Sequence, residues 1–230
     1  VLMTGTTVLV DDDLLERIFP RFEQWVSERN LNIKFDYIER GGYFEIRGKG
    51  KDWLPRHYTM MITEMFQDGV TKCLVGTRGL LGEGWDASRI NVLVDLTTVT
   101  TSMSINQLRG RSFRLDKHWP EKVANNWDIV CLADEFTKGF DDYLRFKRKH
   151  KQLYGVCDDG AIEKGVGHVH AAFTEAEPEG VSETMEIFNE EMLMRARNRG
   201  RARELWGIGQ PFNAVPREAI EIKGSFGEGF

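Results

Sequence analysis

The sequence contains few cysteines, no long apolar run and no excess of positive charge. Its three cysteines, Cys73, Cys131 and Cys157, are an odd number without close paired spacing, so neither a disulfide framework nor a zinc ribbon is expected. No apolar run approaches the roughly 18 residues that span a bilayer, and no basic stretch followed by an apolar core opens the chain. We therefore expect a cytoplasmic protein that does not contact membranes.

The charge balance limits how this chain could contact nucleic acid. Its formal net charge is -5 at pH 7. A protein that coats nucleic acid through bulk electrostatics needs many Lys and Arg side chains to neutralise phosphates. Any nucleic-acid contact of this chain must therefore be local.

Short apolar runs alternate with helical patterns along the first 134 of the 230 residues. The apolar runs span residues 6–10, 32–38, 72–75, 90–96 and 128–133. Near-continuous apolar strands that alternate with helices are typical of a parallel sheet covered on both faces. We therefore predict an α/β fold with a doubly wound parallel sheet over residues 1–134, followed by a mainly helical C-terminal extension over residues 135–230.

Proline and glycine mark expected boundaries between these elements. Pro55 stands where a first helical residue is favoured, and Gly69 is placed to close the same helix. Pro20 is expected to kink or restart the helix that follows the first strand. The glycine-rich, basic residues 41–53 are interpreted as an exposed connection.

A glycine-punctuated loop follows the apolar run at 72–75. In parallel α/β sheets, loops at the ends of strands are where ligands bind. Glycines there let backbone N–H groups approach a phosphate or a ribose, and Asp86 can accept from a hydroxyl or orient an arginine. The alternative interpretation is a turn that needs positive φ values.

A second pattern, QLRGRSFR, spans Gln107 to Arg114 on a predicted helix near residues 103–113. Arg111 and Arg114 are three residues apart, which places both guanidinium groups on one helix face. Two planar, permanently charged groups suit a triphosphate whose negative charge builds on the transferred oxygens. The alternative is a solvated helix with surface arginines.

Together the two stretches, GTRGLLGEGWDA and QLRGRSFR, resemble motifs V and VI of superfamily 2 helicases and translocases. The pattern Q-x-x-G-R-x-x-R of that family is met at Gln107, Gly110, Arg111 and Arg114. The order of strands and helices up to residue 133 also resembles the second, C-terminal RecA-like domain of those proteins, which is P-loop NTPase-like. The resemblance therefore implies a RecA-like fold and one half of an ATP-dependent DNA motor.

The resemblance also implies a role for individual residues. Arg111 and Arg114 would act as arginine fingers on the γ-phosphate of ATP, and Gln107 would organise the same cleft. The residues implied to line the nucleotide are Gly84, Asp86, Glu83 and Gly110. The residues implied to face the phosphate backbone of a bound strand are Thr77, Arg78 and Gly79.

The phosphate-binding half of such an ATPase is absent from this sequence. No G-x-x-x-x-G-K-[ST] pattern occurs, and GKGK at residues 48–51 lacks both the spacing and the hydroxyl that magnesium needs. We expect an N-terminal RecA-like domain of the same polypeptide to hold ATP and Mg²⁺, and this chain alone to be inactive. No metal site is expected here.

Within the family, the E-G-x-D loop and a motif VI that begins with Gln resemble excision-repair helicases and restriction-enzyme translocase subunits. DEAD-box RNA helicases begin motif VI with His. Single-stranded DNA is therefore preferred over RNA as the partner. The alternative function is a non-catalytic nucleic-acid-binding or protein-binding module that retains the helicase fold.

Three weaker patterns each have a plain structural interpretation. The basic run at 145–151 could touch phosphates, but cations at a helix C-terminus also complement its dipole, and we favour the latter. His168 and His170 with a distant thiol make a poor metal site. Trp53 and Trp85 could stack on bases, although burial is the commoner role of tryptophan.

Overall fold

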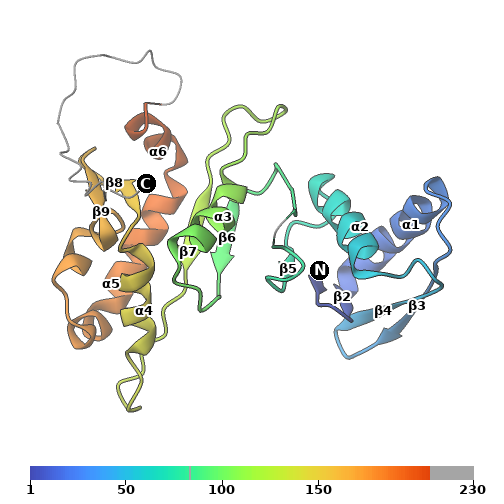
Figure 1. Cartoon of the computed structure of the whole chain (residues 1–230), viewed down its shortest axis with the longest axis horizontal. Coiled ribbons are helices and arrows are strands. Elements are labelled where there is room, and N and C mark those ends of the chain that lie inside the picture. Colours follow the sequence, from blue (N-terminus) through green and yellow to red (C-terminus); the bar gives the residue numbers. More distant parts are fainter. Residues whose placement is uncertain (83, 208–230) are drawn as a thin grey trace, which may run out of the picture.

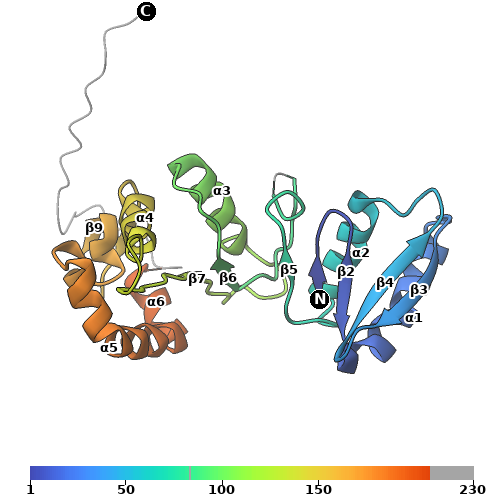
Figure 2. The same ribbon diagram turned by 90° about the horizontal axis from the view of Figure 1, so that it is seen from below.

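A computed structural model describes residues 1–82 and 84–207 of this chain. Three groups of elements follow one another along the long axis of the molecule (Figures 1 and 2). A sheet with two helices lies at the N-terminal end, a parallel strand pair with one helix lies in the middle, and a helical region lies at the other end. The mixed α/β class predicted from the sequence is confirmed.

The N-terminal group is built around a five-stranded sheet with the order β3-β4-β2-β1-β5. Its strands are β1 (Leu2–Met3), β2 (Val8–Asp11), β3 (Lys34–Glu39), β4 (Tyr43–Lys49) and β5 (Val75–Gly76). Helices α1 (Asp12–Glu28) and α2 (Pro55–Gln67) accompany it. Their apolar faces bury a core that includes Phe22, Ile46 and Ile62. Parallel pairing with β1 positions β5, which leads into the loop predicted to bind a ligand.

The first helix does not restart at Pro20, which was one of the two outcomes expected there. Helix α1 continues from Asp12 to Glu28 with Pro20 inside it. Proline removes the N–H that would bond to the carbonyl of Glu16, but both residues are exposed, so water can satisfy that carbonyl. The buried face formed by Leu15, Ile18 and Phe22 then stabilises the helix on both sides of the proline.

Residues 41–53 are not the exposed connection expected from their glycines. Tyr43 to Lys49 form strand β4, which pairs with β3 from Phe44 to Lys49. Gly41 and Gly42 adopt φ values of 63° and 97°, and the N–H of Arg40 donates to the carbonyl of Tyr43 at 2.8 Å. Two consecutive residues with positive φ form the tight turn that suits a β-hairpin. The two glycines therefore make a hairpin turn.

The middle group contains strands β6 (Val92–Asp95) and β7 (Asn125–Asp128) and helix α3 (Ser102–Ser112). The two strands are parallel, with Asp95 opposite Asp128 in the register. Helix α3 connects them through the chain and packs beside both (Figure 2). Strand–helix–parallel strand is the unit that the alternating pattern predicted.

The single doubly wound parallel sheet expected over residues 1–134 is not what the described residues form. Parallel pairing is confined to β1 with β5 and β6 with β7, while β1–β2, β2–β4 and β3–β4 are antiparallel. The physical reason is local, because two hairpins, at residues 4–7 and 40–43, return the chain beside itself before any helical crossover can form.

The C-terminal group consists of helices α4 (Asp141–His150), α5 (Pro178–Arg197) and α6 (Arg199–Leu205) with a small hairpin and two 3-10 turns. The hairpin strands are β8 (Tyr154–Val156) and β9 (Ile162–Lys164), and the turns are η1 (Gly165–His168) and η2 (Ala171–Thr174). A second core forms here around Tyr143, Phe146 and Phe173. Val130 and Leu132 pack against it, so it begins before residue 135.

The described part of residues 135–230 is mainly helical. Its first helix begins at Asp141, and a break at Asn198 separates α5 from α6. Residues 208–230 of the expected extension lie outside the described residues. No helix in the described ranges is long and apolar enough to cross a membrane.

Two adjacent methionines of α2 test the position of the N-terminal core. Met61 is 1% exposed and Met60 is 51% exposed. We expect Met61→Ala to lower the free energy of unfolding by about 2 to 5 kcal/mol, because it leaves a cavity in the core. Met60→Ala should change it by about 0.5 kcal/mol or less. Urea unfolding followed by circular dichroism measures both, and equal losses would contradict this placement of α2.

Candidate functional site

The loop after β5 is shaped by hydrogen bonds and by one obligatory glycine. The carbonyl of Thr77 accepts from the N–H groups of Leu80 and Leu81, both at 3.0 Å, which closes a tight turn. A Cβ on Gly82 would lie 2.2 Å from the carbonyl oxygen of Arg78, so no larger residue fits there without a shift of the backbone. This geometry is compatible with both interpretations of the loop's glycines, as a turn and as a ligand-binding loop.

The same loop is attached to helix α2 by a tryptophan. The indole Nε1–H of Trp85 donates to Thr63 Oγ1 at 2.7 Å, and the Thr63 hydroxyl in turn donates to the carbonyl of Thr59 at 2.6 Å. This hydrogen bond gives Trp85 a structural role, so its presence in the loop does not require stacking on a base. Gly84 just before it has a φ of 80°, a conformation that favours glycine.

Helix α3 carries the second predicted pattern and ends earlier than expected. Gln107, Gly110 and Arg111 lie within α3, which ends at Ser112, and Arg114 lies just beyond the C-cap Phe113. The N–H of Arg114 still reaches the carbonyl of Arg111 at 3.4 Å, so the chain makes one further turn. The two arginines therefore stay close although only one is helical.

The loop and the helix meet at an open cavity of about 330 Å³. Its lining residues are Gly84, Asn106, Gln107, Gly110, Arg111 and Arg114. Five of these six were singled out from the sequence as catalytic or nucleotide-lining. The sixth, Asn106, was missed. The sequence could have indicated Asn106, because it stands four residues before Gly110 and this spacing places both on the same face of a helix.

Both arginines of the QLRGRSFR pattern contact the loop after β5. Arg111 is only 9% exposed, and its Nη1 donates to the carbonyl of Leu81 at 2.5 Å. Arg114 forms an ion pair with Asp86. Burial lowers the pKa of Arg111, and the neighbouring charge of Arg114 lowers it further. The guanidinium group of Arg111 nevertheless remains protonated at neutral pH because arginine titrates far above it.

Among the described residues, the cavity carries one more positive than negative charge. Two guanidinium groups there lie beside one carboxylate, Asp86, whose side chain is largely exposed. Amide groups of Asn106 and Gln107 add donors and acceptors beside them. Such a set can bind an anion with several oxygen atoms, and phosphate is the common biological example.

The remaining predicted residues do not line this cavity, or they lie outside the residues that the structure describes. Thr77, Arg78 and Gly79 are exposed on the loop and do not line the cavity. Arg78 Nη2 donates to Ser104 Oγ of α3 at 3.4 Å, which is a second connection between loop and helix. Glu83 lies outside the described residues.

The weaker patterns have structural roles. Trp53 packs against Tyr58 and Phe35, with ring centroids 5.0 and 5.8 Å apart, and not toward solvent. His170 pairs with Glu191 at 2.9 Å, while the ring of His168 lies against that of His150. The interpretation of these histidines as packing residues accounts for their contacts.

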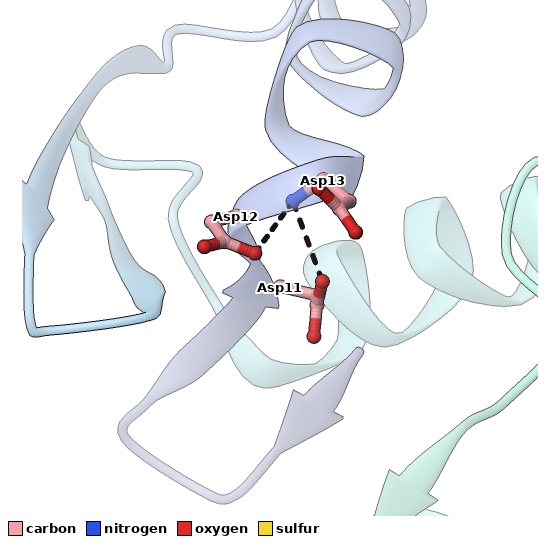
Figure 3. A group of neighbouring side chains, drawn as sticks. All are labelled: Asp11, Asp12 and Asp13. Atoms are coloured by element: carbon pink, nitrogen blue, oxygen red, sulfur yellow. Dashed lines mark hydrogen bonds between the residues drawn. The ribbon is translucent and has the colours of Figure 1, made fainter.

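Among the described residues, one acidic group has the spacing to hold a metal ion, Asp11, Asp12 and Asp13. Figure 3 shows that these side chains serve the start of α1. The backbone N–H of Asp13 donates to Asp11 Oδ1 at 3.3 Å and to Asp12 Oδ1 at 2.9 Å. Carboxylates at a helix N-terminus satisfy free N–H groups and complement the dipole, and this explains the cluster.

A buried network of charges lies behind helix α3 and was missed by the sequence analysis. Asp128 accepts from Arg109 Nη2 at 2.5 Å and from His150 Nε2 at 3.1 Å, and it also pairs with Lys149. Lys149 Nζ lies 2.5 Å from Asp95 Oδ2, outside hydrogen-bonding geometry, so this contact is an ion pair alone. The network joins α3, both parallel strands and α4.

The pKa of Asp128 shows how strongly these cations act. Burial alone would raise it, but the hydrogen bond from His150 and the charges of Arg109 and Lys149 outweigh burial and hold the pKa well below its ordinary value. The signal in the sequence was an Asp at the end of each parallel strand. The basic run at 145–151 gave no hint that Lys149 and His150 point inward.

Comparison of the chain with protein-family models, with curated proteins and with solved structures finds no match.

The two neighbouring histidines predict a pH dependence of stability. Burial, followed by the charge of His150, lowers the pKa of His168 to about 4. The unfolded chain, with a pKa near 6.5, therefore binds a proton that the folded chain does not. Stability should be complete above about pH 6.5 and should fall by about 1 to 3 kcal/mol as the pH approaches 4. Burial lowers the pKa of His150 in the same direction.

Urea unfolding at about pH 7 and about pH 4.5 measures this loss across most of that window. His168→Gln should remove a substantial part of the loss. His118→Gln, at an exposed histidine, is the matched control and should leave it unchanged. Identical pH profiles for His168→Gln and the unmodified chain would refute the assignment of a neutral, buried His168.

Proposed function

We propose that this chain is the second motor domain of an ATP-dependent DNA helicase or translocase of superfamily 2. The observation that supports this most is the meeting of two sequence patterns at one cavity. Gly84, Gln107, Gly110, Arg111 and Arg114 were selected for their resemblance to motifs V and VI, and all five line it. Surface arginines on a solvated helix would have no reason to converge with the loop.

In this proposal, the arginine pair stabilises the negative charge that develops on the γ-phosphate of ATP. The nucleotide and its Mg²⁺ would be held by an N-terminal RecA-like domain of the same polypeptide, which this sequence lacks. Gln107 and Asn106 would bind or orient groups beside the phosphate. Arginine fingers of this kind contribute on the order of 10³ to 10⁵ in rate, because they are preorganised donors in a site that excludes water.

The contacts of Arg111 and Arg114 suggest how the nucleotide would couple to the loop. The carbonyl of Leu81 and the carboxylate of Asp86 occupy donors of the two arginines. A γ-phosphate would compete for those donors, so its arrival would release the loop. Because Thr77, Arg78 and Gly79 lie on the same loop, a strand bound there would respond to the state of the nucleotide.

Exposed apolar side chains on the helix that carries the arginines are consistent with a covering domain. Met103 lies on α3, Phe113 and Leu115 follow it, and each is more than half exposed. Exposed apolar residues near a polar site are typical of an interaction surface. We assign them to the interface with the N-terminal RecA-like domain, whose closure would bring ATP to the arginines.

The RecA-like fold is part of the same proposal. It rests on β6, α3 and β7, a parallel strand–helix–strand unit that carries the arginine pattern after its first strand. It also rests on the parallel pairing of β1 with β5, the strand that leads into the loop.

DNA-stimulated ATP hydrolysis tests the proposed role of the arginines. The protein required is the longer polypeptide in which this chain follows a domain with a Walker lysine. Arg111→Ala or Arg114→Ala should each lower the maximal rate by about 10³ or more, because each removes a charge from the transition state. Arg21→Ala, at an exposed arginine of α1, is the matched control and should keep the full rate.

Activity within about twofold of the unmodified enzyme for both cavity variants would contradict the proposal. Absence of any upstream Walker lysine in the encoding gene would favour the alternative, a non-catalytic module that retains the fold.

A further inference from the structure

The basic run on helix α4 divides into two sets of side chains that point in different directions. Lys149 and His150 are buried and contact Asp95 and Asp128, as described above. Lys147, Arg148 and Lys151 instead line a groove of about 410 Å³ on the outer side of the helix. The inward side chains attach α4 to the parallel strands. The outward side chains make no such attachment and need a separate explanation.

A fourth cation reaches the same groove from a different element. Lys164 ends strand β9, and Gly165, Val166, Gly167 and Thr174 complete the lining. Cations at a helix C-terminus can complement the helix dipole, but that explanation covers α4 alone. It gives no reason for a lysine from the β8–β9 hairpin to join them. The convergence of two elements indicates a site.

These four cations have no acidic partner within residues 1–82 and 84–207. None of them forms an ion pair there, whereas Arg145 on the same helix pairs with Asp142. Lys147 Nζ makes long contacts, at 3.4 and 3.5 Å, with the carbonyls of Thr174 and Ala176, and it lies 5.6 Å from the centroid of the Tyr143 ring. The chain as a whole has a net charge of -5, so four unpaired cations around one groove make this part of the surface positive against the overall charge.

We infer that this groove binds the phosphate backbone of a nucleic-acid strand. Lys147 and Lys151 are four residues apart, so their positions along the helix differ by about 6 Å and both can engage one extended polyanion. Tyr154, in register with Lys164, exposes 51% of its surface beside the groove. An exposed aromatic ring next to a basic groove is the usual arrangement for binding single strands, because bases stack on the ring.

The described residues that line the groove include no Asn or Gln side chain to hydrogen-bond base edges. Binding should therefore depend more on the phosphate backbone than on base sequence. The site is separate from the arginine cavity and uses neither ATP nor a second domain. The inference thus goes beyond the proposed motor function and stands or falls without it. The buried network fixes α4 to α3, which holds the groove at a constant position relative to the cavity.

Equilibrium binding to single-stranded DNA tests this inference on the chain itself. The probe is a fluorescein-labelled oligothymidylate of about 20 nucleotides. This length exceeds the roughly 4 to 16 nucleotides that one OB fold, a common single-strand-binding domain, occupies. Fluorescence anisotropy without nucleotide gives the affinity between about 50 and 200 mM salt. The groove variants are the double change Arg148→Gln with Lys151→Gln and the single change Lys164→Gln.

We expect the double variant to bind at least about fivefold more weakly at low salt. The slope of log affinity against log salt should fall by about 1.4, the value for two phosphate contacts of a single strand. Lys164→Gln should lower the slope by about 0.7. The matched control is the double change Lys34→Gln with Lys51→Gln, which removes two exposed lysines remote in sequence and should have no comparable effect.

Four outcomes would overturn the inference. One is no binding by the unmodified chain. Another is equal weakening by the groove and control variants, which would indicate unspecific attraction. The third is tighter binding to phosphatidylserine vesicles than to the oligonucleotide, lost in the groove variants. The fourth is weakening by Arg78→Gln but not by the groove variants, which would support the motor loop and exclude the groove, so this variant separates the two proposals.

Discussion

Two aspartates held side by side inside the molecule impose the constraint on which the site depends. Asp95 and Asp128 end the parallel strands β6 and β7 and are direct partners in the register. Two carboxylates so placed repel each other, and their burial is unfavourable unless nearby cations compensate it. Lys149 contacts both aspartates, and Arg109 and the imidazole of His150 contact Asp128. Loss of Lys149 or Arg109 would leave a buried charge uncompensated, at a cost of about 3 to 5 kcal/mol.

This network fixes the geometry of helix α3. Arg109 anchors the helix from behind, while Arg111 and Arg114 reach forward to the loop after β5. The loop has its own anchor, the hydrogen bond from Trp85 to Thr63 of α2. The cavity therefore lies between two separately held parts, joined by contacts that involve the arginines themselves. An arrangement with rigid supports and exchangeable contacts is suited to a site that responds to a ligand.

Much of the candidate site could be predicted from the sequence, because its residues stand in short patterns with a geometric meaning. The spacing of Gln107, Gly110 and Arg111 on a helix predicts a shared face, and the structure places all three on the cavity. The sheet was predicted less well. Apolar runs such as Val92–Asp95 suit a strand buried on both faces, yet Val92 and Val94 are about half exposed here. Composition alone does not reveal which neighbour pairs with a strand.

Long-range partners were beyond prediction for the same reason. Lys149 and Arg148 are adjacent and chemically alike, but one is buried against two aspartates and the other lines a groove. Their different environments depend on where β6 and β7 end, more than 20 residues away in the chain. Gly41 and Gly42, in contrast, carried a local signal for a hairpin that was interpreted as a loop.

The central claim is that Arg111 and Arg114 contact a phosphate that another domain supplies. An experimental structure of the longer polypeptide with a non-hydrolysable ATP analogue tests it most directly. The account predicts both guanidinium groups at hydrogen-bonding distance, about 3 Å, from oxygens of the γ-phosphate. It also predicts that the contacts with Leu81 and Asp86 are broken or shared. A closed, nucleotide-bound structure in which both arginines keep those contacts and no side chain of α3 touches the nucleotide would contradict it.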